Sequence, residues 1–336
     1  PGAGAAATGW GGTPEHTVSG VSSGGSMAVN HFVAFSKVTT GAAIVAGSPY
    51  GCNAIEGDDD KCGESPPDTD WPAILRTLSW SLWLKSLVGL VDPLSALSGR
   101  RLYLFSGAND WVVARGVMEA VGAQLSPYVG EEAVARDFST NATHGWVVDG
   151  SACGPAPPGD PASWCQPCCC SPSALLACPG HDLAGRLLWH VQRGEMGLWR
   201  QEASAPLIEV PQADYVGRGR TLDDAGLWHT AYVYAPWKCR SAELWCNVHV
   251  HYHGCAWGAE FMGTDFLMRL GLVDWAEAAN MVFVFPQASG SLDSAGCWDW
   301  TGTSGRWFDT KWGVQLSMVQ ALLKDLPRIL GAWVRP

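Results

Sequence analysis

The sequence predicts an α/β protein with a mostly parallel central sheet and helices on both of its faces. Short apolar segments alternate along the chain with longer segments that are apolar at helical spacing, as in strands joined by crossover helices. With 336 residues, 47% of them hydrophobic, the chain can bury a large core. It contains neither an internal repeat nor a long flexible linker, so we expect a single domain over residues 1–336.

The first half of the chain begins with a strand, a sharp turn and a helix. Residues 16–21 form the expected strand, glycines follow, and apolar residues then recur at helical spacing from Met27 to Phe35. Residues 56–71 and 150–180 are rich in Pro and Gly, so we expect loops there. Further strands are expected at 42–47, 101–107 and 135–140, and further helices at 75–91, 116–125 and 182–194.

The second half repeats the alternation of strands and helices. Apolar and alternating segments predict strands at 229–236, 246–254 and 281–286. Residues 266–280 are expected to form a helix, and so are residues 313–334, where Pro327 predicts a kink. None of these segments has 18 consecutive apolar residues, so we expect no membrane span.

Charge and cysteine content narrow the class of protein. A net charge of −11 disfavours nucleic acid and anionic membranes as partners, since phosphate groups are bound by clustered Lys and Arg. Twelve cysteines indicate a secreted, disulfide-bonded protein. The alternative is a metal site in the segment "CQPCCC". It has one Cys-x-x-Cys spacing without a second pair, so we expect no metal. Its cysteines are Cys165, Cys168, Cys169 and Cys170.

A candidate nucleophile lies between the first strand and the first helix. Gly20-Val21-Ser22-Ser23-Gly24 matches G-x-S-x-G, in which a strained turn lifts the serine hydroxyl clear of the sheet. An ordinary Gly-Ser turn would give the same letters. The flanking strand and helix favour the nucleophile elbow of an α/β-hydrolase fold, with Ser22 as nucleophile.

An acid and a base follow the nucleophile in the order expected of such a hydrolase. Asp110 comes directly after the strand 101–107, and His144 comes after the next strand. We expect Ser22, Asp110 and His144 to form a catalytic triad. His249, His251 and His253 lie on one face of a strand and would also suit a metal. We expect them to pack beside the site instead, with His253 shaping the oxyanion loop.

An oxyanion hole needs two N–H groups aimed at the developing negative charge. The residue after the nucleophile, Ser23, supplies one of them. The segment "HYHGC", residues 251–255, has the strand-to-loop character expected of the second. It follows the triad in the chain, however, whereas this loop normally precedes the nucleophile.

Several stretches resemble the extracellular poly(3-hydroxybutyrate) depolymerases and related polyester esterases: "GVSSGG", "AGSPYGC", "SGANDWVV", "THGW", "HVHYHGC", "VFVFPQA" and "GCWDW". Most members carry "HGC" and "GCWDW" before the serine, whereas here both come after it. The order resembles that of the circularly permuted, single-domain fungal type. The nucleophile, acid and base then lie in 1–200, and the oxyanion-loop half, in 229–334, has moved to the end of the chain. A helix 313–334 ending near the N-terminus would fit this rearrangement.

The resemblance implies specific site residues and disulfides. It implies the Ser22–Asp110–His144 triad and an oxyanion hole formed by the N–H groups of Ser23 and Cys255. The implied disulfides are Cys52–Cys62, Cys153–Cys178, Cys239–Cys246 and Cys255–Cys297. The cysteines of "CQPCCC" have no counterpart, so their pairing stays open.

The implied function is a secreted, monomeric serine esterase without a cofactor, acting on an aliphatic polyester such as poly(3-hydroxybutyrate). We expect Trp111, Trp146 and Trp257, which stand beside the acid, the base and the oxyanion loop, to contact the substrate, and Trp298 is a candidate for polymer adsorption. These tryptophans leave the ester open. One alternative is a feruloyl, acetyl or aromatic-polyester esterase, and another is a non-catalytic polymer-binding protein. Asn141-Ala142-Thr143 is a glycosylation sequon directly before His144, and its use stays open.

Overall fold

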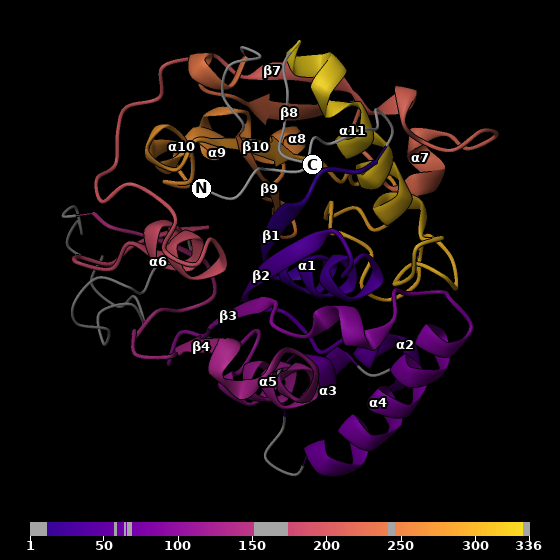
Figure 1. Ribbon diagram of the computed structural model, residues 1–336. Coiled ribbons are helices and arrows are strands. Elements are labelled where there is room, and N and C mark those ends of the chain that lie inside the picture. Colours follow the sequence, from indigo (N-terminus) through magenta and orange to yellow (C-terminus); the bar gives the residue numbers. More distant parts are fainter. Residues whose placement is uncertain are drawn as a thin grey trace, which may run out of the picture.

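The computed structural model describes residues 12–56, 59–63, 65, 69–150, 174–240 and 246–331. Its centre is an eight-stranded sheet with the strand order β4-β3-β2-β1-β9-β10-β8-β7 (Figure 1). The strands are β1 (His16–Val21), β2 (Thr39–Val45), β3 (Arg101–Phe105), β4 (Val134–Asp137), β7 (Ile208–Pro211), β8 (Thr230–Tyr234), β9 (Asn247–Tyr252) and β10 (Met281–Phe285). The strands from β4 to β10 in this order pair in parallel, and β8 is antiparallel to both of its neighbours. The predicted α/β class is confirmed.

The strand order fits a rearranged chain. Counted from β7 to β10 and then from β1 to β4, the strands take the order 1-2-4-3-5-6-7-8 across the sheet. In this count β1 is the fifth strand and lies between the two halves of the chain, where it pairs with β2 on one side and β9 on the other. The sheet therefore has the strand order of an α/β-hydrolase in which the sequence order of the strands is circularly permuted.

Helices cover both faces of the sheet and enclose two cores (Figure 1). Strand residues alternate between the two, so Ala42 and Ile44 of β2 enter one core while Ala43 and Val45 enter the other. The first core is covered by α1 (Ser23–Ala34), α4 (Trp71–Leu87), α5 (Arg115–Val129) and α11 (Val314–Leu330). The second is covered by α6 (Leu183–Val191), α9 (Asp265–Met268) and α10 (Val273–Ala279). The other short helices are α2 (Cys52–Glu56), α3 (Asp59–Cys62), α7 (Leu222–Ala225) and α8 (Ala259–Met262).

Three differences from the expected elements have local causes. The helix expected at 266–280 is divided into α9 and α10, because Gly271 between them has a φ of +75°. Strand β7 was not expected from the sequence, because it is short, lies at the sheet edge and ends in a proline, so that its apolar pattern is weak. A separate two-stranded sheet of β5 (Trp146–Val148) and β6 (Leu175–Ala177) was also not expected, because its strands have only three residues each and show no clear alternation.

Disulfides occur at three of the pairings that the resemblance implies: Cys52–Cys62, Cys239–Cys246 and Cys255–Cys297. Cys178 is also disulfide-bonded, but Cys153 and the "CQPCCC" cysteines lie outside the described residues. Residues 1–11 and 332–336 also lie outside the described residues. The expectation that the helix 313–334 ends near the N-terminus therefore stays a prediction. No helix in the described part of the chain is long and apolar enough to cross a membrane.

Candidate active site

Ser22 lies in a strained turn between β1 and α1. Its backbone has φ 59° and ψ −126°, a conformation that non-glycine residues rarely adopt and that marks functional turns. The turn is closed so tightly that a Cβ on Gly20 would lie 2.0 Å from the carbonyl oxygen of Gly24. The Ser22 N–H donates to the Val45 carbonyl oxygen (3.0 Å), which fixes the turn to β2. The motif Gly20–Gly24 thus has the geometry of a nucleophile elbow.

Gly24 lets the "HGC" segment pass directly against the start of α1. A Cβ at this position would lie 2.3 Å from the carbonyl oxygens of both Tyr252 and His253. Any larger residue at position 24 would push the two segments apart. The structure therefore brings the end of β9 and the elbow together, although more than 200 residues separate them in the chain.

Asp110 and His144 form a hydrogen-bonded pair. The Nδ1 atom of His144 lies 2.9 Å from Oδ2 of Asp110. The other carboxylate oxygen, Oδ1, accepts the backbone N–H groups of Val112 (3.0 Å) and Val113 (2.9 Å). The Asp110 side chain is only 2% exposed, against 14% for that of His144. The carboxylate is thus fixed at both oxygens while the imidazole stays partly open to solvent.

Backbone contacts hold the acid and the base in register. The N–H groups of Ala108 and Asn109 donate to the carbonyl oxygens of Thr140 (2.8 Å) and Ala142 (3.0 Å). A Cβ on Gly107 would lie 2.1 Å from the same Ala142 oxygen, so the two loops touch there. The loops follow β3 and β4, which are parallel to β1, so their residues lie at the same sheet edge as Ser22.

Two segments from the second half of the chain meet Ser23. Because Ser23 is the first residue of α1, its N–H has no acceptor within the helix and lies at the positive end of the helix dipole. Its Oγ accepts the N–H of Trp298 (3.3 Å). The Cys255–Cys297 disulfide joins the residue before Trp298 to the "HGC" loop. The loop is held further by the Ala256 N–H, which donates to the Ala295 carbonyl oxygen (2.6 Å).

The buried side chain of His253 also supports the "HGC" loop. Its Nδ1 lies 2.8 Å from the carbonyl oxygen of Gly254, and its Nε2 accepts the N–H of Ala288 (3.1 Å). Burial lowers the pKa of His253 to about 4, so the neutral imidazole that accepts this N–H persists near neutral pH. Gln287 adds a second support, since its Oε1 accepts the N–H of Ala259 (2.7 Å). Sequence reasoning missed Gln287, whose signal is its place directly after a buried strand in "VFVFPQA".

His249 and His251 lie in the core below the site. The Ser19 hydroxyl lies between them, 2.7 Å from Nε2 of His249 and 2.8 Å from Nδ1 of His251. Thr17 Oγ1 lies 2.7 Å from the other nitrogen of His249. Burial lowers the pKa of His249 to about 3 and that of His251 in the same direction. Within the described residues no group of three or more His, Cys, Asp and Glu side chains could hold a metal ion.

Two of the four tryptophans expected to meet substrate do not face solvent. Trp146 and Trp298 are both 0% exposed, so the expectations that Trp146 faces the substrate and that Trp298 adsorbs the polymer are wrong. The Trp146 indole N–H donates to the carbonyl oxygen of Leu270 (2.8 Å), as a core residue does. Trp111 is 74% exposed next to Asp110, and the half-buried Trp257 has its ring centroid 5.8 Å from that of His144.

Comparison with known proteins gives consistent matches over nearly the whole chain. No protein-family model matches it. The poly(3-hydroxybutyrate) depolymerase of Delftia acidovorans is 30% identical over 331 residues, which is 96% of this chain. The chain spans only 61% of that relative. The polyhydroxybutyrate depolymerase of Talaromyces funiculosus is 27% identical over 323 residues, 92% of this chain and 88% of the relative.

Solved structures show the same similarity in three dimensions. The crystal structure of the PHB depolymerase from Penicillium funiculosum matches with a TM-score of 0.78 and 27% identity. The match covers 94% of this chain and 96% of that one. A substituted PHB depolymerase in complex with an R3HB trimer matches with the same TM-score and coverage at 26% identity.

Proposed function

Because the chain belongs to the family of the poly(3-hydroxybutyrate) depolymerases, we propose that it is a serine esterase that hydrolyses an aliphatic polyester such as poly(3-hydroxybutyrate). The strongest single support is the hydrogen bond between His144 and Asp110 at the sheet edge that carries the strained Ser22. A polyester is the substrate class of the similar enzyme bound to an R3HB trimer.

The proposed reaction proceeds through an acyl-enzyme. The Ser22 hydroxyl attacks the ester carbonyl carbon while His144 accepts its proton, and Asp110 orients the imidazole and stabilises its charged form. The N–H groups of Ser23 and Cys255 hold the negative charge that develops on the carbonyl oxygen. His144 then protonates the leaving alkoxide, and the alcohol half of the polymer departs. A water molecule, deprotonated by His144, finally hydrolyses the acyl-enzyme and releases the carboxylic acid.

The place of action and the assembly state belong to the same proposal. The disulfides favour an oxidising compartment, so we infer that the protein is secreted. We infer that it acts as a monomer on a polymer or oligomer, with no cofactor. Trp111 and Trp257 are the tryptophans still proposed to contact substrate, because one is exposed beside Asp110 and the other packs beside His144.

A second candidate keeps the mechanism and changes the ester. Two tryptophans beside the acid and the base would also suit an aromatic acyl group, as in feruloyl esters or an aromatic polyester. Parallel assays on poly(3-hydroxybutyrate) film and on feruloyl esters separate the two, with products identified by mass spectrometry. The primary proposal predicts 3-hydroxybutyrate monomers and oligomers from the film and none with Ser22→Ala. Efficient release of ferulate with an intact film would instead support the second candidate.

A further inference from the structure

Helix α4 carries apolar residues on two opposite faces. Ile74, Leu78 and Leu82 are buried against the rest of the protein. On the outer face Trp80 is 61% exposed and Trp83 is 45% exposed, together with Leu84, Leu87 and Val88 of the same stretch. The helix lies at the outside of the molecule, at the lower right in Figure 1. A contiguous apolar surface of this kind is uncommon on a soluble protein and marks an interaction site.

The two tryptophans are already arranged for contact with a flat surface. Their rings stack with centroids 5.0 Å apart and an interplanar angle of 25°. They also line a shallow groove together with Pro72, Leu75, Arg76 and Ser79. Because each ring restricts the other, little side-chain freedom remains to be lost on binding. We refer to Trp80, Trp83, Leu84, Leu87 and Arg76 as the α4 face.

Charge identifies the kind of partner that fits the α4 face. Residues 71–91 contain no Asp or Glu, although the chain has 32 acidic against 21 basic residues. The two basic residues of this segment are Arg76 and Lys85, and Lys85 is paired with Asp309, so Arg76 is the cation of the groove. Ester hydrolysis leaves carboxylates on a polyester, and these repel a chain of net charge −11. The α4 face itself carries no acidic side chain, although Asp70 caps the start of the helix.

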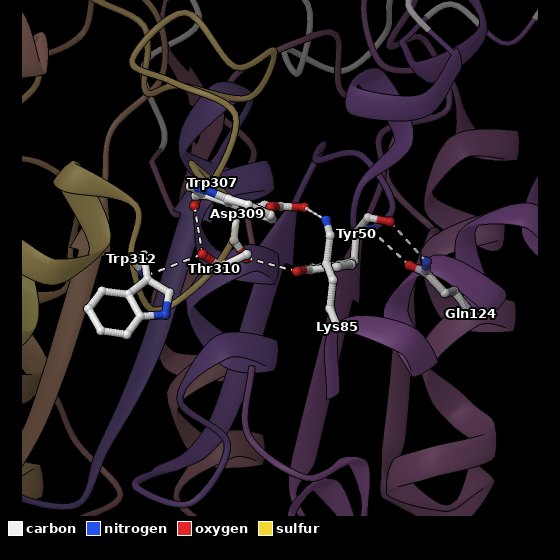
Figure 2. A network of polar contacts seen from close by, with 7 residues as sticks. All are labelled: Tyr50, Lys85, Gln124, Trp307, Asp309, Thr310 and Trp312. Atoms are coloured by element: carbon white, nitrogen blue, oxygen red, sulfur yellow. Dashed lines mark hydrogen bonds and ion pairs between the residues drawn. The ribbon is translucent and has the colours of Figure 1, made fainter. Parts of the chain in front are cut away.

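The start of α4 contacts the segment that follows Asp110, and its end contacts the loop that follows Trp298. Trp71, at the start of the helix, packs against the buried cluster that contains Val113, and Val112 packs against the same cluster; both valines follow Asp110. Near the end of the helix, the side chain of Lys85 meets that of Asp309, whose carbonyl oxygen accepts the hydroxyl of Tyr50 (2.9 Å) (Figure 2). Trp312, 73% exposed, lies on the same loop as Asp309 (Figure 2). These contacts fix the position of the α4 face relative to the segment after Asp110 and to the loop after Trp298.

We propose that the α4 face is the site by which this chain adsorbs to solid polyester, with the stacked Trp80 and Trp83 as its anchors. The inference rests on the proposed function and adds to it a binding site separate from the residues that do chemistry. Its occupant is an apolar polymer surface with scattered carboxylates. Contact is made by the flat faces of the indole rings, and Arg76 pairs with the chain ends that hydrolysis exposes.

Adsorption is measured without turnover by using Ser22→Ala as the parent. Isotherms on poly(3-hydroxybutyrate) particles compare this parent with the same chain carrying Trp80→Ala and Trp83→Ala. We expect the binding constant to fall at least about tenfold, the order of loss found when a buried tryptophan anchor is removed. Arg76→Glu in the same background weakens binding further on particles that were partly hydrolysed beforehand. The matched control is Leu198→Ala with Trp199→Ala, an exposed apolar pair elsewhere, and it leaves the isotherm unchanged.

A second readout separates this inference from the proposed function. With Ser22 present, the Trp80→Ala/Trp83→Ala variant hydrolyses a soluble hydroxybutyrate trimer at the parental rate and loses activity only on particles. Unchanged adsorption of the double variant overturns the inference, and so does an equal loss in the control pair. Sedimentation that finds a parental dimer and a monomeric variant assigns the face to a second copy of the chain and also overturns it. If the unsubstituted chain fails to hydrolyse the trimer, the proposed function is refuted, and the adsorption isotherms still test the α4 face on their own.

Discussion

The Nδ1 atom of His144 lies 2.9 Å from Oδ2 of Asp110, whose other oxygen accepts two backbone N–H groups. One carboxylate oxygen therefore accepts hydrogen bonds from the backbone, and the other accepts one from the imidazole. This division fixes the tautomer of His144, since Nδ1 must carry a proton to meet the carboxylate and Nε2 is left to accept one. A general base needs this state.

Asp110→Asn tests the importance of that tautomer. The amide oxygen can still accept the N–H groups of Val112 and Val113, so we expect the free energy of unfolding to change little. Its NH₂ group, however, favours a His144 protonated at Nε2, which cannot act as base. We expect kcat on a soluble ester to fall by about 10³- to 10⁴-fold, the order seen for such a change in a Ser-His-Asp triad. A loss below tenfold would show that Asp110 does not orient the base.

Gly24→Ala tests the close packing between the elbow and the "HGC" loop. The added Cβ would lie 2.3 Å from two carbonyl oxygens, so one segment has to move. We expect unfolding in guanidinium to show a loss of about 2 to 3 kcal/mol, together with a lower kcat. Gly217→Ala is the matched control, because nothing lies within 4 Å of its Cβ position. Equal stability of the two variants would contradict the packing described.

The tryptophans near the site are expected to separate into two groups. Trp146→Ala empties a fully buried position and removes the bond to Leu270, so we expect it to cost about 3 to 5 kcal/mol of stability. Trp111→Ala removes a ring that is 74% exposed, so we expect little change in stability and a raised KM for oligomeric esters. Thermal melts and steady-state kinetics on both variants check this division. A parental KM in the Trp111 variant would remove that residue from the substrate site.

Buried histidines predict a loss of stability in acid. Burial lowers the pKa of His16 to about 4, that of His249 to about 3 and that of His253 to about 4, from 6.5 when exposed. Between those values and pH 6.5 the unfolded chain binds more protons than the folded one. The stabilisation is therefore complete above about pH 6.5 and is lost as the pH falls through the folded values. Each residue adds a slope approaching about 1.4 kcal/mol per pH unit.

Guanidinium unfolding from pH 7 to pH 4.5 measures this slope. We expect the unfolding free energy to fall steadily across the range, and His229→Gln, at an exposed position, to leave the curve unchanged. A flat profile would show that these histidines are not held neutral in the folded protein.

Most of the sheet was predictable because its strands are buried on both faces and read as short apolar runs. The placing of Ser22, Asp110 and His144 was predictable for a related reason, since each follows a strand in a parallel sheet. Strands β5 and β6 could not be found this way, since three residues set no period. The break at Gly271, which divides the expected helix 266–280, could not be predicted, because single glycines also occur within helices.

The burial of individual tryptophans depends on partners that are distant in the chain. Trp146 stands two residues from His144, yet it begins β5, and its N–H meets the carbonyl oxygen of Leu270, 124 residues away. Trp298 packs edge-on against Tyr252, with ring centroids 4.9 Å apart. Nearness to His144 in the sequence placed Trp146 at the site, and Trp298 was expected at the polymer-binding surface, whereas only tertiary packing decides which way a ring turns. The α4 face was missed for the same reason, since its segment reads simply as an apolar helix.

The central claim is that Ser22 is a nucleophile activated by His144. Labelling with a fluorophosphonate, followed by peptide mass spectrometry, tests it most directly because only an activated serine reacts with this reagent at an appreciable rate. We expect one equivalent of label on the peptide that contains Ser22, and none in Ser22→Ala or after unfolding. Label on another residue, or ester hydrolysis by Ser22→Ala at the parental rate, would contradict the account.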